Sequence, residues 1–318
     1  MAPKNTVSII LPYFNNEKTI EDAILSFTTN AGAHDELICV NDGSDDYSEH
    51  IVLSYANRDS RIVSRSQENL GPGAARNTGL KIASRNWVGF LDADDLLSEE
   101  YFRFGVRLLS NTTANVVVLP VVLKNAIDNS FYLAEWCNAH PQKDKDICTS
   151  EISGAIFQKT NPAPWNKLYR RSFLNELIIE FNEELHPIED LSFTYEAIAK
   201  SEIIRFSERG AVIHFWQGGG RSSLIKSSAI STLDALFDLH SRLISQLNVN
   251  RNLASSFIKL SSSVLRSNYK SAGMPVRLKI LQLISESIIF SIPQKIRFVL
   301  ICITPQRVID FGLTFRGS

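Results

Sequence analysis

The sequence is poor in cysteine and in long hydrophobic runs, and each scarcity excludes a class of protein. Its 318 residues include four cysteines, none in a CxxC pair or another metal-ligand spacing, so neither a disulfide framework nor a zinc site is indicated. Cys39 and Cys302 lie in apolar runs, which predicts small buried side chains. A membrane-spanning helix needs about 18 or more apolar residues in succession. The nearest candidate, 288–303, is interrupted by a proline and two cations, so a spanning helix is not expected.

The sequence also has no excess of either charge. The 33 lysines and arginines nearly balance the 34 aspartates and glutamates, which gives a net charge of −1, so a nucleic-acid partner is not expected. Hydrophobic residues at 44% and charged residues at 21% are ordinary for a globular protein and exclude global disorder. No apolar signal segment precedes the first expected strand, which favours a reduced, cytoplasmic compartment.

Up to about residue 120, the chain alternates between two hydrophobic periods. Short apolar runs typical of buried strands are followed by segments whose apolar residues recur at helical spacing. This alternation predicts an α/β fold with a mostly parallel central sheet that is flanked by helices. The expected strands are 7–11, 37–40, 62–63, 87–91 and 116–119, and the expected helices are 17–29, 47–57, 72–84 and 98–110.

The pattern changes further along the chain and becomes helical after residue 222. We therefore expect an α/β domain over 1–225 and a helical C-terminal region over 226–318. In the irregular stretch between, strand-like pieces are expected at 131–133, 203–206 and 211–215, with a helix at 191–200. The expected C-terminal helices are 231–247, 253–269 and 276–290.

Polar clusters follow three of the expected strands, at 12–15, 41–45 and 92–95. Ligands of parallel sheets bind outside the carboxyl ends of the strands, so we expect these clusters to meet at one sheet edge. Asp92 and Asp94 form an Asp-x-Asp pair whose carboxylates would repel each other without a cation, and Mg²⁺ or Mn²⁺ prefers such oxygen ligands. The alternative is that Asp94 or Asp95 caps the following helix.

Two further segments have both a structural and a functional interpretation. The turn at 41–45 contains Asp42, which either only closes the strand or accepts a hydrogen bond from a base N–H. The segment 71–79 opens a helix with small residues and supplies Arg76. It matches neither a P-loop nor the GxGxxG spacing. It therefore either packs closely or brings Arg76 to a ligand or an aspartate.

Six segments, in this order and spacing, resemble the inverting glycosyltransferases of family 2. The segments are VSIILPYFN at 7–15, VNDGSD at 40–45, ENLGPGAARNTG at 68–79, GFLDADD at 89–95, WNKLYR at 165–170 and EDLSF at 189–193. The resemblance covers about residues 5–225 and implies a GT-A nucleotide-sugar-binding fold there. It also implies a metal-dependent, hexosyltransferase-like enzyme of cell-surface polysaccharide synthesis, such as lipopolysaccharide or capsule. Such an enzyme moves a sugar from a nucleotide-diphosphate donor, expected to be UDP-linked, to a hydroxyl of a glycan or lipid-linked acceptor.

On the donor side, the resemblance assigns roles to seven residues of this chain. Asp94 is expected to bind the Mn²⁺ or Mg²⁺ that bridges the two phosphates, and Asp92 to contact the ribose or a metal-bound water. Asp42 is expected to hydrogen-bond the base, with Arg76 near the base and the carboxylates. Those expected to line the nucleoside pocket are Pro12, Phe14 and Asn15. Family members usually have Tyr where this chain has Phe14, so stacking on the base is kept and a hydroxyl contact is lost.

On the acceptor side, the resemblance makes Asp190 the general base, with Glu189 beside it. Read without the resemblance, Glu-Asp at a helix start is an ordinary N-terminal charge pair. Trp165 and Lys167 are expected on the acceptor or phosphate side, although a core Trp is the alternative. His214 is either a metal ligand or a histidine satisfied within the fold, and the glycine-rich loop 217–223 either closes over the diphosphate or is a surface turn.

The C-terminal segment 276–318 has six basic and two acidic residues, a net charge of +4, among dense apolar residues. This pattern predicts helices that lie on the cytoplasmic face of a membrane, or helices packed on the α/β domain with a solvated basic rim. Two other functions compete with transfer. A nucleotide-sugar-binding protein without catalysis is disfavoured by the intact Asp92, Asp94 and Asp190. A nucleotidyltransferase is disfavoured because 12–15 is not a basic activating loop.

Overall fold

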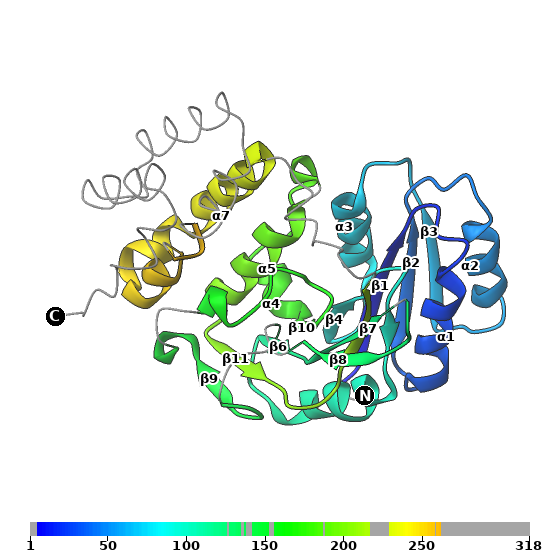
Figure 1. Ribbon diagram of the computed structural model, residues 1–318, viewed down its shortest axis with the longest axis horizontal. Coiled ribbons are helices and arrows are strands. Elements are labelled where there is room, and N and C mark those ends of the chain that lie inside the picture. The colour runs from blue at the N-terminus through cyan, green and yellow to red at the C-terminus, as the bar shows by residue number, and fades with distance from the viewer. Residues whose placement is uncertain are drawn as a thin grey trace.

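The structure is a computed structural model that describes residues 5–125, 127–134, 137, 142–152, 156–186, 188–216, 229–257 and 259–261. In that part of the chain, two β-sheets lie at the centre and helices cover them (Figure 1). No helix among the described residues combines the length and apolar character required to cross a membrane. The loop 217–223, the expected helix 276–290, the basic C-terminal segment and Cys302 lie outside the described residues, as does the end of the expected helix 253–269.

The larger sheet has eight strands in the order β3-β2-β1-β4-β10-β6-β11-β9. Four of its seven neighbouring pairs are parallel, so the predicted mostly parallel sheet is confirmed. The strands are β1 (Val7–Tyr13), β2 (Glu36–Asn41), β3 (Ile62–Ser66), β4 (Trp87–Phe90), β6 (Val116–Val118), β9 (Asp146–Cys148), β10 (Lys167–Arg170) and β11 (Ile203–Phe206). Their apolar residues are almost all buried, as strands covered on both faces require.

Helices cover both faces of the parallel part of this sheet. Figure 1 shows α3 on one side of β1, β2 and β3, and α1 with α2 on the other side. The helices are α1 (Ile20–Asn30), α2 (Ser48–Ala56), α3 (Pro72–Ile82), α4 (Arg171–Glu176), α5 (Glu189–Lys200) and α7 (Ala229–Val249). Short 3-10 turns are η2 (Leu109–Asn111), η4 (Thr149–Glu151), η5 (Ile156–Gln158) and η6 (Glu183–Leu185).

The segment expected to be a helix at 98–110 is helical from residue 99, and its central part is the π-helical turn η1 (Tyr101–Val106). Ser98 caps it, because its Oγ accepts a hydrogen bond from Tyr101 N at 3.2 Å. The alternative interpretation, in which Asp94 or Asp95 is the cap, is therefore wrong. Both aspartates precede β5 (Leu96–Leu97) instead.

A smaller sheet stands beside the first, with strand order β5-β12-β7-β8. Its other strands are β12 (Val212–Trp216), β7 (Val121–Asn125) and β8 (Phe131–Leu133). Ile213 on β12 pairs with Leu96 on β5. This register brings the residues after Ile213 to the end of the 92–95 cluster, which sequence spacing could not show.

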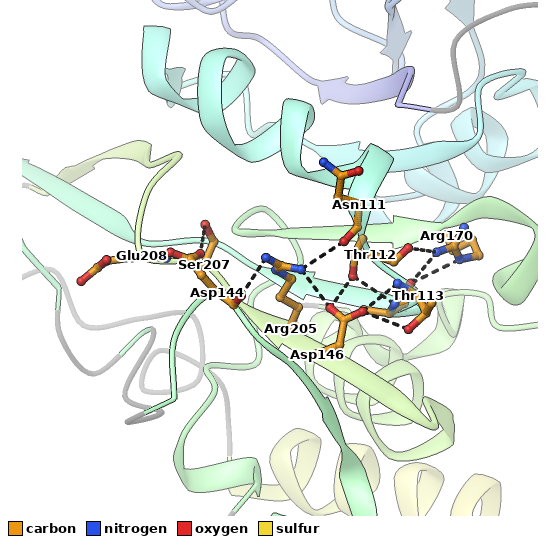
Figure 2. A network of polar contacts seen from close by, with 10 residues as sticks. Asn111, Thr112, Thr113, Asp144, Asp146, Arg170, Arg205, Ser207 and Glu208 are labelled. Atoms are coloured by element: carbon orange, nitrogen blue, oxygen red, sulfur yellow. Dashed lines mark hydrogen bonds and ion pairs between the residues drawn. The ribbon is translucent and has the colours of Figure 1, made fainter.

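The far edge of the larger sheet is held by a polar network around Asp146 and Arg205 (Figure 2). Asp146 on β9 accepts hydrogen bonds from Thr112 Oγ1 at 2.6 Å and Thr113 N at 2.7 Å, and it pairs with Arg205 Nη1 at 3.1 Å. Arg205 Nη2 also donates to the Asp144 carbonyl at 2.8 Å. The network lies four strands from β4 in the sheet order, so its role is to attach a three-residue edge strand.

Helix α7 packs against α5, as Figure 1 shows. Arg242 on α7 pairs with Glu196 on α5 at 2.7 Å, and Asn182 Nδ2 donates to Asp238 Oδ1 at 3.0 Å. The predicted helical region therefore begins on the surface of the α/β domain. The boundary at 225/226 remains a prediction.

Candidate active site

The three polar clusters expected at one sheet edge meet there. Strands β2, β1 and β4 are neighbours and run parallel, so their carboxyl ends point the same way. Asp42 N donates to the Tyr13 carbonyl at 2.9 Å, and Asn15 Oδ1 accepts from Asp45 N at 3.0 Å. These contacts hold the first two clusters together, and Arg76 reaches the third cluster from α3.

The end of β1 contains the residues expected to contact a nucleoside. Pro12 and Tyr13 are buried, whereas the side chain of Phe14 is 46% exposed, so Phe14 rather than Tyr13 offers a ring at this edge. Asn15 has a φ of 54°, in the left-handed region that Asn tolerates better than most residues. This backbone conformation directs the chain into the turn that contacts Ser44 and Asp45.

Asp42 is buried, and its carboxylate holds a neighbouring loop. Oδ1 accepts from Gln67 Nε2 at 2.8 Å and Leu70 N at 3.0 Å, while Oδ2 accepts from Gly71 N at 2.9 Å. The carboxylate therefore positions the chain that enters α3. This role was not foreseen from the sequence, which suggested a turn or a contact to the base.

Arg76 is the centre of the site. Its side chain is 5% exposed, and its guanidinium joins three carboxylates. Nη1 lies 2.9 Å from Glu189 Oε1 and 2.9 Å from Asp190 Oδ1, and Nη2 lies 3.0 Å from Asp92 Oδ1. Burial opposes the charge of Arg76, but the carboxylates, Asp190 foremost, raise its pKa above the ordinary value. One cation thus connects the end of β4 with the start of α5.

The small residues of α3 allow this arrangement. A Cβ on Gly79 would lie 2.4 Å from Ile10 Cγ2, so only glycine lets α3 approach β1 this closely. A Cβ on Gly73 would lie 3.2 Å from Glu189 Cγ, next to the ion pairs. Asn77, one residue after Arg76, holds the chain around Phe181 against α3. Its side chain exchanges two hydrogen bonds of 2.9 Å with the backbone of Phe181. The sequence signal for Asn77 was a polar residue on the buried side of a small-residue helix.

Asp190 and Glu189 differ in access although they are adjacent. The side chain of Asp190 is 24% exposed, and Arg76 donates to its Oδ1. Burial raises the pKa of Asp190 to about 7, against the lowering effect of Arg76 and with the help of Glu189 and Asp92. The side chain of Glu189 is 5% exposed, and its Oε2 has no hydrogen-bond partner. Glu189 is thus a buried partner of Arg76 rather than a group that faces an acceptor.

Lys167 differs from the expectation for the acceptor or phosphate side. It is fully buried at the start of β10, and its Nζ donates to Asn161 Oδ1 at 2.7 Å, Asn166 Oδ1 at 2.7 Å and the Ala163 carbonyl at 2.6 Å. Burial lowers its pKa to about 7. The three oxygens occupy all three donors of the ammonium, so Lys167 organises the loop before β10 and offers nothing to a phosphate.

The end of the 92–95 cluster contains a group that sequence reasoning missed. Asp95 is fully buried, and its oxygens lie 2.8 and 2.9 Å from His214 Nδ1. The His214 ring stacks on Trp165 with a centroid distance of 5.0 Å and an interplanar angle of 12°. Burial raises the pKa of Asp95 to about 7, opposed by the hydrogen bond to His214, and that bond raises the pKa of His214 although burial lowers it. The sequence contained one signal for this role of Asp95: Ser98 can cap the following helix, so Asp95 is not needed as the cap.

Asp94 lies on the surface of the same turn. Loss of hydration and the nearby Asp92 raise the pKa of Asp94, while His214 lowers it. Asp94 therefore interacts electrostatically with both Asp92 and His214. Within the described residues, no three His, Cys, Asp or Glu side chains gather closely enough to enclose a metal ion. A cation at this turn would therefore need ligands beyond the described side chains, such as the phosphates of a nucleotide.

Several known proteins are similar to this chain in sequence. A family model described as "Glycosyl transferase family 2" matches residues 8–178, more than half of the chain. The chain is 32% identical over 210 residues to the "Uncharacterized glycosyltransferase EpsJ" of Bacillus subtilis (strain 168), covering 65% of this chain and 60% of that protein. It is 28% identical over 195 residues to the "Poly(ribitol-phosphate) beta-N-acetylglucosaminyltransferase TarS" of Staphylococcus aureus (strain Mu50), covering 60% of this chain and 32% of that protein. The chain thus spans less than two thirds of the length of these relatives.

Solved structures share the fold. The crystal structure of S. aureus TarS 1-349 has a TM-score of 0.70 at 19% identity, covering 95% of this chain and 82% of that chain. The same fragment in complex with UDP has a TM-score of 0.67 at 21% identity, covering 88% and 78%. These similarities confirm the predicted GT-A architecture.

Proposed function

The chain belongs to glycosyl transferase family 2, and from this membership we propose that it moves a sugar from a nucleotide-diphosphate donor to a hydroxyl of an acceptor. We propose a UDP-linked donor because a similar fold has been solved with UDP and with UDP-GlcNAc. We propose a cell-surface polysaccharide, or its lipid-linked precursor, as the acceptor. Two similar proteins are named as poly(ribitol-phosphate) glycosyltransferases, one a beta-glucosyltransferase and the other a beta-N-acetylglucosaminyltransferase.

The Arg76 ion pairs support this function more than any other observation. Transfer with inversion needs a carboxylate base on the acceptor side of the anomeric carbon and a binding site for the leaving nucleotide on the other side. Arg76 links Asp92, which follows β4 at the edge proposed to bind the nucleotide, to Asp190 at the start of α5. Donor-side and acceptor-side groups are thus held within one hydrogen-bonded cluster.

In the proposed mechanism, Asp190 takes the proton of the acceptor hydroxyl. The acceptor oxygen forms a bond to the anomeric carbon as the bond from that carbon to the diphosphate oxygen breaks. The partly exposed carboxyl of Asp190 has the access this step needs, and a pKa raised to about 7 suits a base near neutral pH. Phe14 offers a stacking face to the base of the nucleotide.

We further propose that Mn²⁺ or Mg²⁺ assists at Asp94 and His214. The residues fit such an ion: Asp94 is exposed, and the bond from His214 Nδ1 to Asp95 leaves Nε2 as the remaining ring nitrogen. A bound cation would neutralise the diphosphate and stabilise the charge on the departing nucleotide. Asp92 Oδ1 is held by Arg76, so Asp92 is expected to act through the ribose or a water.

A donor panel tests the transferase function. UDP-, GDP- and dTDP-sugars are incubated with the protein and Mn²⁺, and release of the nucleoside diphosphate is measured. We expect turnover with a UDP-sugar. Asp190→Asn keeps the shape of the side chain but cannot take a proton, so acceptor-dependent turnover should fall by about 10²–10⁴-fold while donor binding persists. Asp22→Asn, on the exposed face of α1, is the matched control.

The metal assignment has its own test. Asp94→Ala should abolish Mn²⁺-dependent UDP binding in calorimetry while the protein remains folded. Unchanged Mn²⁺-dependent affinity in folded Asp94→Ala would contradict the assignment of Asp94, and no donor turnover across the whole panel would contradict the transferase function.

A further inference from the structure

Asp95 is a buried carboxylate without a role in the mechanism proposed above. Its side chain is 0% exposed, so neither nucleotide nor acceptor can reach it. Oδ1 accepts from Phe215 N at 3.1 Å, and both oxygens face His214 Nδ1 at 2.8 and 2.9 Å. All its contacts thus point to β12. A buried charge of this kind persists only when its partners are fixed.

The carboxylate determines which nitrogen of the His214 ring carries the proton. In its ionised form the Asp95 carboxylate can only accept hydrogen bonds, so Nδ1 is then the donor. In the neutral ring, Nε2 then carries the lone pair. Stacking on Trp165, which is itself buried, holds the plane of the ring, and within that plane the bond from Nδ1 to Asp95 determines where Nε2 lies.

We propose that Asp95 is a positioning residue that keeps His214 in the Nδ1–H tautomer and leaves Nε2 free to bind the divalent cation beside Asp94. This inference rests on the proposed function and deepens it, because it explains how one turn supplies the metal ligand Asp94 and, in the next residue, the group that orients His214. The pairing of β5 with β12 makes this possible, since Ile213 opposite Leu96 brings His214 to Asp95.

The arrangement has a known energetic effect. A metal-binding histidine commonly donates its other N–H to a carboxylate, which fixes the tautomer and orientation, and loss of such a partner costs roughly 10–100-fold in metal affinity. With no group of three protein ligands among the described residues, the site depends strongly on the ligands it has. If Nε2 of His214 did not face the cation, Asp94 would be the main protein ligand of the cation.

The decisive measurement is the tautomer of His214, read by ¹⁵N-edited NMR of the histidine side chains at a pH where the ring is neutral. His214→Gln assigns the signal. We expect the wild-type protein to be protonated on Nδ1. In Asp95→Asn, one of the two oxygens near Nδ1 becomes an NH₂ donor while the amide oxygen keeps the bond from Phe215 N, so the fraction of rings protonated on Nδ1 should fall and the fraction protonated on Nε2 should rise.

Calorimetry of Mn²⁺ binding in the presence of UDP provides the second readout. Asp95→Asn should lower Mn²⁺ affinity by roughly 10–100-fold, and His214→Gln by a similar factor. Asp35→Asn is the matched control. It makes the same change at another buried carboxylate, one that accepts from Val7 N and Gly32 N at 2.9 Å, and it should alter neither the tautomer nor the affinity.

The outcomes separate this inference from the proposed function. A wild-type ring protonated on Nε2 overturns the role of Asp95 without any variant, so the test survives if Asp95→Asn does not fold. Full Mn²⁺ affinity in Asp95→Asn, with affinity lost in His214→Gln, also overturns it. Full affinity in His214→Gln instead overturns the assignment of His214 as a metal ligand.

Discussion

The carboxyl group of Asp190 is under two opposing influences. Burial, Glu189 and Asp92 raise its pKa, whereas Arg76 lowers it, and the result lies at about 7. A base must be unprotonated to act, and a raised pKa keeps the carboxyl protonated over more of the acidic range. The activity should therefore depend on pH near neutrality rather than near the ordinary Asp value of about 3.9.

We expect kcat/KM for transfer to rise with pH up to a plateau, with its midpoint near pH 7. The measurement is a pH–rate profile at low substrate concentration. The residual activity of Asp190→Asn over the same pH range is the control and should not follow this curve. A rate profile that is flat through neutral pH would show that Asp190 does not titrate as the base.

Arg76→Gln should be among the most destabilising changes at this site. It leaves the buried Glu189 with only His186, whose Nδ1 lies 3.9 Å from Oε2, and breaking a buried ion pair in this way costs about 3–5 kcal/mol. Urea unfolding measures the loss. Arg103→Gln, which removes the exposed pair with Glu99, is the control and should change the free energy of unfolding by less than about 0.5 kcal/mol. Equal effects of the two changes would mean that Glu189 finds another partner.

Individual site residues could be predicted where they belong to a recognisable sequence motif. Asp190 and Arg76 could be singled out from their segments and prove to be hydrogen-bonded to each other at 2.9 Å. The burial of Lys167 and the pairing of Asp95 with His214 could not be foreseen, because both depend on contacts between segments far apart in the chain. His214 and Asp95 are 119 residues apart, and only the strand register joins them.

Among the elements, α3 determines how closely the site is packed. Its contact with β1 has no room for a methyl group at Gly79. Because Arg76 is on the same helix, a shift of α3 away from β1 would also stretch the ion pairs to Asp92 and Asp190.

Gly79→Ala should therefore destabilise the protein by about 1–3 kcal/mol, the usual cost of overpacking, and should reduce donor turnover as well. Thermal unfolding and turnover are measured together. Lys81→Ala, at an exposed position of α3, is the control. Ile10→Ala removes the atom that the new methyl group would meet, so the double variant should lose less stability than the sum of the singles. Strict additivity would rule out this contact.

Hydrophobic periodicity located most elements of the first 120 residues, because buried parallel strands and amphipathic helices repeat over many residues. Strands β5, β7, β9 and β10 were missed. Short strands show no period of their own, so strands such as β8 and β11 were found only where their residues are apolar. Strand β9 is held by the side chains around Asp146 as much as by its own sequence, as Figure 2 shows.

At the scale of the whole molecule, the basic C-terminal segment is the part predicted to bind a membrane surface. Its sequence predicts attraction to anionic lipid, and its residues lie outside those that the structure describes. The described portion of α7 packs on α5, so removal of later residues should leave the α/β domain folded.

Deleting the residues after 291 should release the protein from anionic liposomes without stopping donor hydrolysis. Sedimentation with vesicles at low salt measures binding, since charge attraction is strongest there. Neutral vesicles are the control and should bind neither form. If the full-length chain ignores anionic vesicles even at low salt, the membrane interpretation is wrong.

The ion pairs of Arg76 also concern the order of events during synthesis. Arg76 leaves the ribosome 114 residues before Asp190, and at about 5–20 residues per second that interval is roughly 6–23 s. During this time the β1–β4 half can form its parallel strands, but α3 has no Glu189 or Asp190 to neutralise its guanidinium. A fully packed half would then bury a charge with Asp92 as its main partner. The nascent chain should therefore keep α3 loosely attached and exposed to chaperones until α5 emerges, so that a late folding step of the domain also completes the candidate site.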